Sequence, residues 1–251
     1  MFLPTTLKEV RARGWDELDV IIFSGDAYID HPAFGPAVIG RILEAEGYRV
    51  AIVPQPNWRD DLRDFTKLGK PRLFFAVSAG AMDSMVNHYT ANLRLRSNDA
   101  YTPGGKAGFR PDRAIDTYTK ILKRLYPHTP VVVGGIEASL RRLTHYDYWS
   151  DKLQRSVLAT SGADLLIYGM GDKPIREVAK SLRNGFNMKL LRGLRQVGFL
   201  ADKEYVERLY NGKTIVLNTF EECVQDKHKF GENFCNIAQL SNMMEGKTTR
   251  V

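Results

Sequence analysis

The sequence has few cysteines and no long apolar run. Its 251 residues contain only Cys223 and Cys235, which are too few for a disulfide framework and too isolated for a zinc or iron–sulfur site. We expect both to be ordinary buried thiols. No stretch approaches the ~20 apolar residues that a membrane helix needs, and the N-terminus lacks the apolar core of a signal peptide. The expectation is a cytoplasmic protein without a membrane partner.

Common catalytic motifs are also missing. No Gly-x-Gly-x-x-Gly follows the first predicted strand, which counts against a nicotinamide-dependent dehydrogenase, and the pair Gly169 and Gly171 is too short to replace it. No serine lies in a nucleophile elbow, and no histidine pair has the spacing of metal ligands. We therefore expect no metal site in this chain, identify no catalytic residue, and regard catalysis by the chain alone as poorly supported.

The charge balance is mildly basic. The sequence has 36 Lys and Arg against 29 Asp and Glu, a net charge of +7, with 43% hydrophobic residues. This excess permits an anionic ligand or a nucleic-acid contact but requires neither.

Five short apolar runs alternate with helical patterns. The predicted strands are 18–23, 48–54, 73–77, 131–133 and 163–168, and the clearest predicted helices are 36–46, 114–126, 136–143 and 174–182. This alternation, with glycine following each strand, predicts an α/β fold with a doubly wound, mostly parallel five-stranded sheet of the Rossmann-like kind. Right-handed crossovers would bring the strand ends together at one edge.

The pattern changes after Gly185. Two short basic helices, a short strand and a long helix are predicted at 188–200, 202–210, 214–217 and 219–245. The long helix would begin with a capping box formed by Thr219 and Glu222. We predict a Rossmann-like domain at 1–185 and a mostly helical extension at 186–251 that packs against another part of a larger protein.

Polar side chains gather at the predicted strand ends. In the richest stretch a strand breaks at Gly134 and Gly135 into a helix, which places unpaired backbone N–H groups in the crevice where open α/β sheets bind ligands. The candidate binding residues, chosen by their position near this edge, are Asp26, Tyr28, His31, Ser78, Asp83, Lys106, Arg110, Gly134, Gly135, Glu137, Ser139, Arg141, His145, Gly169 and Gly171.

Two of these positions allow more than one interpretation. The polar loop at 97–111, with the basic stretch 103–113, is favoured as a mobile basic segment. The second interpretation, if the loop folds over the sheet edge, is an anion clamp formed by Lys106, Arg110 and Arg113. His31 follows Asp30 directly, so the Asp-x-His-x-x-Gly spacing of a cobalt-ligating histidine is not met. A histidine that supports the turn is favoured.

Four segments of the sequence together resemble a known protein family. Residues 24–35 (SGDAYIDHPAFG), 83–114 (DSMVNHYTANLRLRSNDAYTPGGKAGFRPDRA), 131–158 (VVVGGIEASLRRLTHYDYWSDKLQRSVL) and 163–175 (ADLLIYGMGDKPI) closely resemble the N-terminal region of the YgiQ family of radical SAM proteins. The resemblance extends from about Phe2 to the Thr219 region. It implies a cobalamin-domain-like α/β domain paired with a barrel, whose Cys-x-x-x-Cys-x-x-Cys motif binds a [4Fe-4S] cluster that cleaves S-adenosylmethionine.

That triple-cysteine motif is absent from this sequence. The resemblance therefore implies that the cluster and S-adenosylmethionine bind a barrel missing from this chain. That barrel would be its main partner, in the same polypeptide or in a downstream gene product. The leading hypothesis is that this domain covers the mouth of the barrel and shapes its substrate site, with substrate and reaction left open.

Two other functions remain open. One is a stand-alone module that binds cobalamin, without a histidine ligand to cobalt, or a nucleotide. Alternatively, the chain contacts RNA through basic side chains at Arg94, Arg96, Lys106, Arg110 and the 189–195 stretch.

Overall fold

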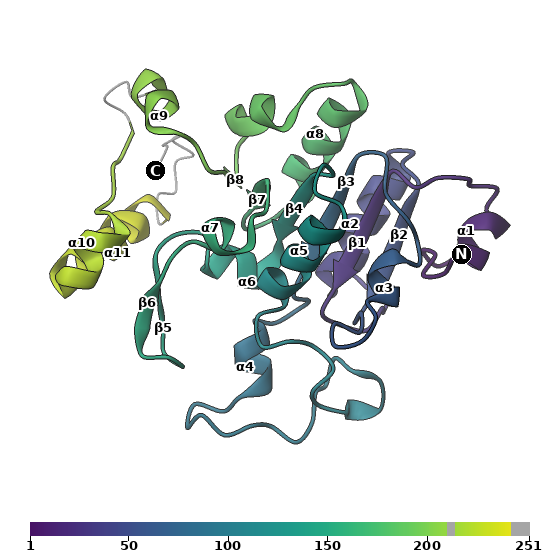
Figure 1. Cartoon of the computed structure of the whole chain (residues 1–251), viewed down its shortest axis with the longest axis horizontal. Coiled ribbons are helices and arrows are strands. Elements are labelled where there is room, and N and C mark those ends of the chain that lie inside the picture. The colour runs from purple at the N-terminus through teal and green to yellow at the C-terminus, as the bar shows by residue number, and fades with distance from the viewer. Residues whose placement is uncertain (210–213, 242–251) are drawn as a thin grey trace. The chain divides into compact units, whose positions relative to one another are not determined.

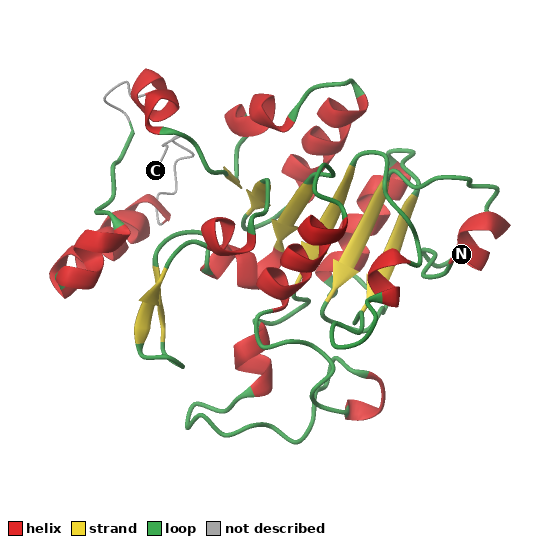
Figure 2. Ribbon diagram, in the orientation of Figure 1, coloured by secondary structure: helices red, strands yellow, loops and turns green. Residues whose placement is uncertain are grey.

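In the computed structural model, which describes residues 1–209 and 214–241, the apolar runs form one six-stranded sheet (Figure 1, Figure 2). The strand order is β2-β1-β3-β4-β7-β8. The strands are β1 Val20–Ser24, β2 Val50–Pro54, β3 Phe74–Ser78, β4 Val131–Gly134, β7 Leu165–Ile167 and β8 Val197–Gly198. The first five are parallel and β8 is antiparallel to β7. The predicted α/β fold is confirmed, with one strand more than the five expected, because a two-residue strand leaves no periodic pattern in the sequence.

Helices cover both faces of this sheet, so it is doubly wound. The helices before residue 185 are α1 Leu7–Ala12, α2 Gly35–Ala45, α3 Arg63–Thr66, α4 Ser84–His88, α5 Ala114–Leu125, α6 Gly135–Leu140, α7 Val157–Ser161 and α8 Asp172–Arg183. Side chains of α3, α5 and α7 pack on one face, with Phe65 and Tyr118 fully buried there. Leu43 of α2 and Val178 of α8 are buried on the other face.

The register of the strands decides which side chains share a face. Ile22, Ala76 and Val132 are partners across β1, β3 and β4, and they lie on the face covered by α2 and α8. In the next row toward the carboxyl ends, Ser78 pairs with Gly134. Side chains are therefore small at the centre of the sheet near this edge.

Several local predictions were wrong in their details. The predicted helix 136–143 is only α6, and Ile136 and Leu140 are 43% and 57% exposed instead of facing the core. The predicted helix 188–200 is a 3-10 helix at Met188–Gly193 followed by β8. Glycine follows β1, β3, β4 and β7 closely, but β2 ends at Pro54 and continues into Gln55.

The chain divides into two compact units. Unit 1 is Met1–Leu143 with Ser156–Phe199, and unit 2 is Thr144–Arg155 with Leu200–Val251. Unit 1 holds the whole sheet. The division into domains at 1–185 and 186–251 stays a prediction.

Unit 2 contains a β-hairpin and helices. They are β5 His145–Asp147, β6 Lys152–Gln154, α9 Lys203–Leu209, α10 Phe220–Gln225 and α11 Lys227–Ser241. The predicted capping box is confirmed, because the Thr219 hydroxyl accepts the Glu222 N–H and the Glu222 carboxylate accepts the Thr219 N–H at 2.8 Å. The predicted single helix is instead two helices, since Asp226 between them has extended backbone.

Two further predictions concern the same region. The strand predicted at 214–217 does not form. Residue 210 and residues 242–245, which were included in predicted helices, lie outside the described residues.

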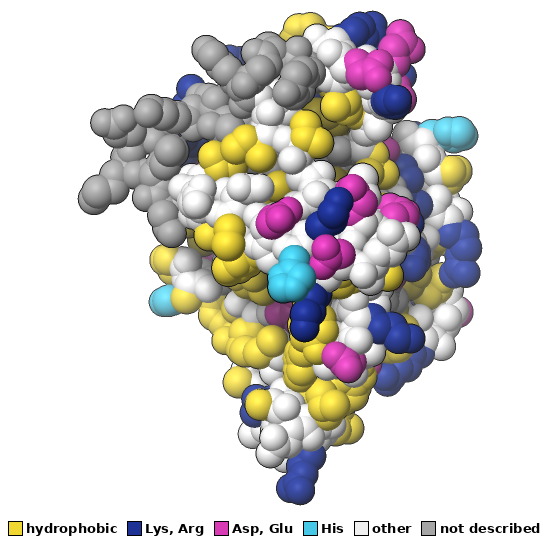
Figure 3. Space-filling view, turned by 90° about the vertical axis from the view of Figure 1, so that its left-hand side faces the viewer, with side chains coloured by type: hydrophobic (Ala, Val, Ile, Leu, Met, Phe, Trp, Pro, Cys, Tyr) yellow, Lys and Arg dark blue, Asp and Glu magenta, His cyan; other side chains and the backbone are white. Residues whose placement is uncertain are grey.

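Apolar side chains are also present at the surface. In unit 2, Val216 is 71% and Phe234 is 68% exposed. Figure 3 shows one face of the molecule, on which hydrophobic side chains in yellow lie among charged ones. Among the helices of the described segments, none combines the length and apolar character needed to cross a membrane.

Candidate functional site

The carboxyl ends of the parallel strands of unit 1 carry most of the predicted site residues. Asp26 follows β1, Ser78 ends β3, and Gly134 ends β4 directly before Gly135, the first residue of α6. The structure therefore brings together residues more than 100 positions apart in the sequence. Parallel strands present their carboxyl ends at a common edge, which is where open α/β sheets bind ligands.

Arg110 anchors the long polar loop to this edge. Its side chain has no exposed surface, and its guanidinium donates to Asp26 at 2.6 Å, to Asp99 at 3.2 Å and to the Ala79 carbonyl at 3.0 Å. The other carboxylate oxygen of Asp26 accepts the N–H of Ala81 at 2.6 Å. The 97–111 loop thus folds against the strand ends, as the second interpretation of this loop required.

The burial of Arg110 does not favour either of the two alternatives that used it, an anion clamp or an RNA contact. Two buried carboxylates already pair with its single positive charge, and a solvent-borne anion has no access to it. Burial raises the pKa of Asp26, and the neighbouring Arg110 opposes that rise. Arg110 therefore acts as a structural tie between the loop and β1.

A second buried cluster joins α4, α5 and α6. Glu137 is 1% exposed, and its carboxylate accepts the N–H groups of Ser84 and Ile115, each at 3.0 Å. Arg141 bridges Glu137 at 3.3 Å and Asp83 at 2.9 Å. Burial raises the pKa of Glu137, although Arg141 opposes this. These candidates are used to hold the starts of α4 and α5 beside the strand ends.

Between the sheet and the first turns of α2 and α8 lies an apolar slot of about 360 Å³. Its volume is at the lower end of the ~300–1,000 Å³ typical of ligand pockets. Ile22, Ala76, Val132 and Ile167 form its floor. The rim carries candidates Ser78, Gly134, Gly135, Gly169 and Gly171, and also Asp172, the first residue of α8.

One glycine at the rim cannot be replaced without a rearrangement. Gly135 has φ +84°, and a Cβ atom at this position would lie 2.7 Å from Ser78 Oγ. A side chain here would therefore both strain the backbone and crowd the rim. This requirement keeps the β4–α6 turn small beside the slot.

The other candidates lie apart from the slot interior. The hydroxyl of Tyr28 accepts the N–H of Leu3, and Nδ1 of His31 accepts the N–H of Ala33 at 3.1 Å. His31 thus supports its own turn, as favoured above. Lys106 is exposed on the long loop. Ser139 donates to the Gly135 carbonyl and accepts the N–H of Gly169, so it ties two rim turns together.

His145 belongs to a different part of the molecule. It lies in β5 of unit 2, paired with Gln154 across the hairpin.

Sequence reasoning missed three residues that matter at this edge. They are Asp99 in the long loop, which accepts from Arg110, and Ala76 in β3 and Asp172 at the start of α8, which line the slot. A signal existed for two of them: Ala76 is the small residue of an otherwise bulky strand, and Asp172 follows a strand-end glycine. Asp99 gave no signal, because its role depends on a contact with Arg110.

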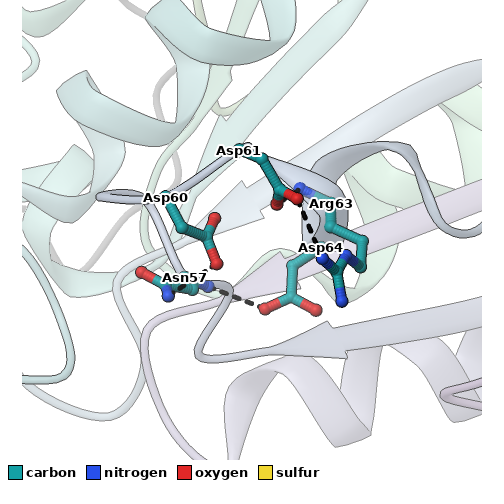
Figure 4. A pocket seen from close by; sticks show the side chains of 5 residues that line it. All are labelled: Asn57, Asp60, Asp61, Arg63 and Asp64. Carbon is teal, nitrogen blue, oxygen red and sulfur yellow. Dashed lines mark hydrogen bonds and ion pairs between the residues drawn. The ribbon is translucent and has the colours of Figure 1, made fainter.

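A second hollow, of about 480 Å³, lies at the start of α3 (Figure 4). It is lined by Asn57, Asp60, Asp61, Arg63 and Asp64. The polar groups satisfy one another: Asp64 accepts the backbone N–H of Asn57, the Asn57 amide donates to Asp60 at 2.7 Å, and Arg63 pairs with Asp61 at 2.9 Å. These contacts are those of a polar turn, and we assign no ligand to it.

The residues of this chain do not fit an iron–sulfur cluster. Across 1–209 and 214–241, no three His, Cys, Asp or Glu side chains are grouped to hold a metal ion. Cys223 is buried, as predicted, but Cys235 is exposed, and both are free thiols. The residues that line the slot include no histidine or cysteine, so the slot offers cobalt no imidazole or thiolate ligand.

The fold and this edge define a doubly wound α/β domain with an apolar slot at the carboxyl ends of its strands. A family model described as "Radical SAM N-terminal" matches residues 2–250, and the chain belongs to this family. The recognition of a radical SAM N-terminal region from sequence is thereby confirmed.

Among its relatives are UPF0313 proteins of known sequence. The protein from Porphyromonas gingivalis is 61% identical over 97% of this chain and 38% of its own length, and that from Bacteroides thetaiotaomicron is 60% identical over 96% and 40%. The chain therefore spans about two fifths of the length of the curated relatives it matches. It corresponds to one part of these longer relatives.

Solved structures with a similar chain trace include TsrM from Kitasatospora setae, a radical S-adenosylmethionine methyltransferase. One was determined with tryptophan substrate and a SAM analog, and another with cobalamin and a [4Fe-4S] cluster. In both comparisons the TM-score is 0.47 and the sequence identity 17%, over 73% of this chain. The match covers 28% and 29% of the respective TsrM chains.

Proposed function

We propose that this chain is the N-terminal domain of a radical SAM enzyme, and that the carboxyl edge of its sheet forms one wall of the substrate site. The iron–sulfur cluster and S-adenosylmethionine would bind in the longer remainder of the polypeptide. The observation that carries the proposal is the apolar slot, which opens among glycine-rich turns at this edge. Glycines at a rim let another chain or a ligand approach the backbone closely.

The buried ion pairs support the same role. A surface loop usually has exposed polar contacts, whereas Arg110 ties the 97–111 loop to Asp26 through fully buried groups. Arg141 similarly fixes α4 to α6 through Asp83 and Glu137. Ligand sites work best when their surroundings are held in place, and these ties fix the edge around the slot.

Hydrogen–deuterium exchange tests the placement of this edge. The comparison is between this chain and the full-length Porphyromonas gingivalis relative, with protection factors measured for equivalent segments. We expect slower exchange in the full-length protein at the turns after β1, β3, β4 and β7. The matched controls are the turns at the opposite edge, around residues 47–49 and 127–130, which we expect to be unchanged. Protection confined to the opposite edge would contradict the proposal.

Reconstitution tests the division of chemistry. After anaerobic treatment with iron and sulfide, the full-length relative should show the charge-transfer absorption of a cluster and cleave S-adenosylmethionine. This chain should do neither. A cluster formed on this chain alone, with cleavage of S-adenosylmethionine, would overturn the assignment of that chemistry to the remainder of the polypeptide.

A second candidate is a module that binds cobalamin or a nucleotide independently of any barrel. The slot is the observation that favours it, because its volume and apolar lining suit one ring system. Calorimetry on this chain with cobalamin, S-adenosylmethionine and nucleotides tests it. If one of these ligands binds this chain as tightly as it binds the full-length relative, the result would support a module that binds its ligand without a barrel.

A further inference from the structure

The slot exists because the residues at the centre of the sheet are small. On the face under α2 and α8, β1, β4 and β7 contribute Ile22, Val132 and Ile167 to the floor, whereas the middle strand β3 contributes only Ala76. At the rim, Ser78 and Gly134 are also small. The crossovers from β3 and β4 place α5 and α7 on the opposite face. No larger side chain among the described residues fills the space beside Ala76, so a hollow remains between the sheet and the two helices.

The interior of the slot is apolar. Pro36, Val38 and Ile39 of α2 and Ile175 of α8 line the side opposite the sheet. A charged group placed among these side chains would lose its hydration without a compensating partner. The occupant of the interior is therefore neutral, and a planar ring suits a space bounded by a sheet on one side and helices on the other.

The rim offers polar groups of two kinds. Ser78 Oγ accepts the N–H of Gly80 at 3.2 Å, which leaves its hydroxyl proton to donate to a ligand. Asp172 is half-buried at the start of α8, and its carboxylate can accept from an amine or a hydroxyl. A carboxylate at the mouth also disfavours a second negative charge there.

We propose that the slot binds a neutral nucleoside-like group: a planar heteroaromatic ring in the apolar interior, with amine or sugar hydroxyl donors at the rim beside Asp172 and Ser78. This inference deepens the proposed function, since it names the ligand class of the same edge. A purine nucleoside and the benzimidazole nucleoside of the cobalamin tail share this chemistry. Both are used as probes.

The experiment is calorimetry on this chain with adenosine, with 5,6-dimethylbenzimidazole riboside, and with adenosine monophosphate as the charged counterpart. We expect at least one of the neutral nucleosides to bind. We also expect adenosine monophosphate to bind at least about fivefold more weakly than adenosine, if adenosine is the better ligand, because its phosphate lies near Asp172. Asp172→Asn should reduce the difference in affinity between adenosine and adenosine monophosphate, and it should also lower the affinity for the neutral nucleoside.

Ala76→Val tests the interior directly. It adds two methyl groups to the floor, and we expect it to weaken nucleoside binding at least about tenfold while the melting temperature stays the same or rises, since it fills an empty space. The matched control is Ala45→Val at the exposed end of α2, which adds the same atoms away from the slot and should leave binding unchanged.

The outcomes separate the sources and decide the proposal. Binding of adenosine alone, of the benzimidazole riboside alone, or of both supports it and identifies the ring. Absence of binding by both nucleosides, or binding that Ala76→Val leaves unchanged, overturns it. If Ala76→Val fails to fold, Asp172→Asn replaces it, and unchanged affinity for the neutral ligand then overturns the proposal. Either failure leaves the hydrogen-exchange test of the proposed function standing, because protection by a covering domain needs no nucleoside.

Discussion

Replacing Arg110 by methionine should destabilise unit 1 more than any surface change. The substitution keeps an unbranched, apolar chain of similar length and removes the guanidinium. It leaves the carboxylates of Asp26 and Asp99, each 1% exposed, without a cation, and it leaves the Ala79 carbonyl without its donor. The cost therefore comes from three groups that stay buried and lose their partner.

The magnitude follows from those groups. Removing one partner of a buried ion pair costs ~3–5 kcal/mol, because the remaining charge is uncompensated. Since Arg110 serves two carboxylates, we expect a loss of about 4–5 kcal/mol. A domain of ordinary stability has ~5–15 kcal/mol in total, so the variant should still fold but with much of its stability lost.

Urea unfolding at pH 8 measures this loss. The matched control is Arg124→Met, which makes the same change on the exposed end of α5 and should stay within ~0.5 kcal/mol of the original protein. Combining Arg110→Met with Asp26→Asn removes one of the stranded charges. The double variant should therefore be less destabilised than the sum of the single ones, by about 1–3 kcal/mol.

The dependence on pH gives a second readout. Burial already raises the pKa of Asp26, and without Arg110 this rise should grow. A carboxyl group whose pKa is raised by folding takes up a proton on folding, so the variant should lose stability as pH rises. Its deficit should be larger at pH 8 than at pH 5. A deficit below about 1 kcal/mol, or full additivity with Asp26→Asn, would refute the structural role assigned to Arg110.

Two further changes test other parts of the same unit. Gly80 has φ +109°, and a Cβ atom there would lie 2.1 Å from Asp26 Oδ1. In thermal or urea unfolding, Gly80→Ala should therefore lose more stability than the control Gly104→Ala, where φ is +69° and no atom would lie within 4 Å of the Cβ. Equal losses of stability would contradict a clash between residue 80 and Asp26. Although burial alone would raise the pKa of Asp19, its hydrogen bonds and ion pairs with Arg49 and Arg72 hold that pKa below its usual value. The stability that the ionised Asp19 contributes is present above its unfolded pKa of ~3.9 and is lost as the pH falls through its folded pKa. Asp19→Asn should therefore lower the free energy of unfolding by about 1–3 kcal/mol at pH 7 and by less near pH 3. An equal loss at both pH values would contradict this role of Asp19.

The sheet could be predicted from sequence because its signals are local. Runs such as VIIF and VVV combine β-branched and aromatic residues, which are typical of strands buried on both sides, and each is followed by turn residues. The helix 114–125 carries its apolar residues at helical spacing and was predicted to within one residue. The prediction that the helix at 136–143 buries its apolar face was wrong, because Ile136 and Leu140 have the same helical spacing but lie on an exposed surface.

The role of Arg110 could not be predicted, because it depends on a partner 84 residues away. An arginine in a glycine-rich loop is usually solvated, and only the folded chain brings Asp26 and Asp99 against it. The sequence correctly placed Arg110 near the strand ends but misjudged its exposure. Position at an edge follows from topology, whereas exposure follows from packing between distant segments.

The slot could be predicted in part from the sequence. Parallel register and alternation of side chains follow from the strand pattern, so Ala76 and Gly134 could have been assigned to the same face in adjacent strands. Small residues in adjacent central strands predict either a closely packed helix or a space. Which of the two forms depends on the crossovers: those from β3 and β4 place α5 and α7 on the opposite face, and the slot remains beside Ala76. A bulky residue at position 76 would then fill the slot without disturbing the sheet, and for this reason Ala76→Val can separate ligand binding from stability.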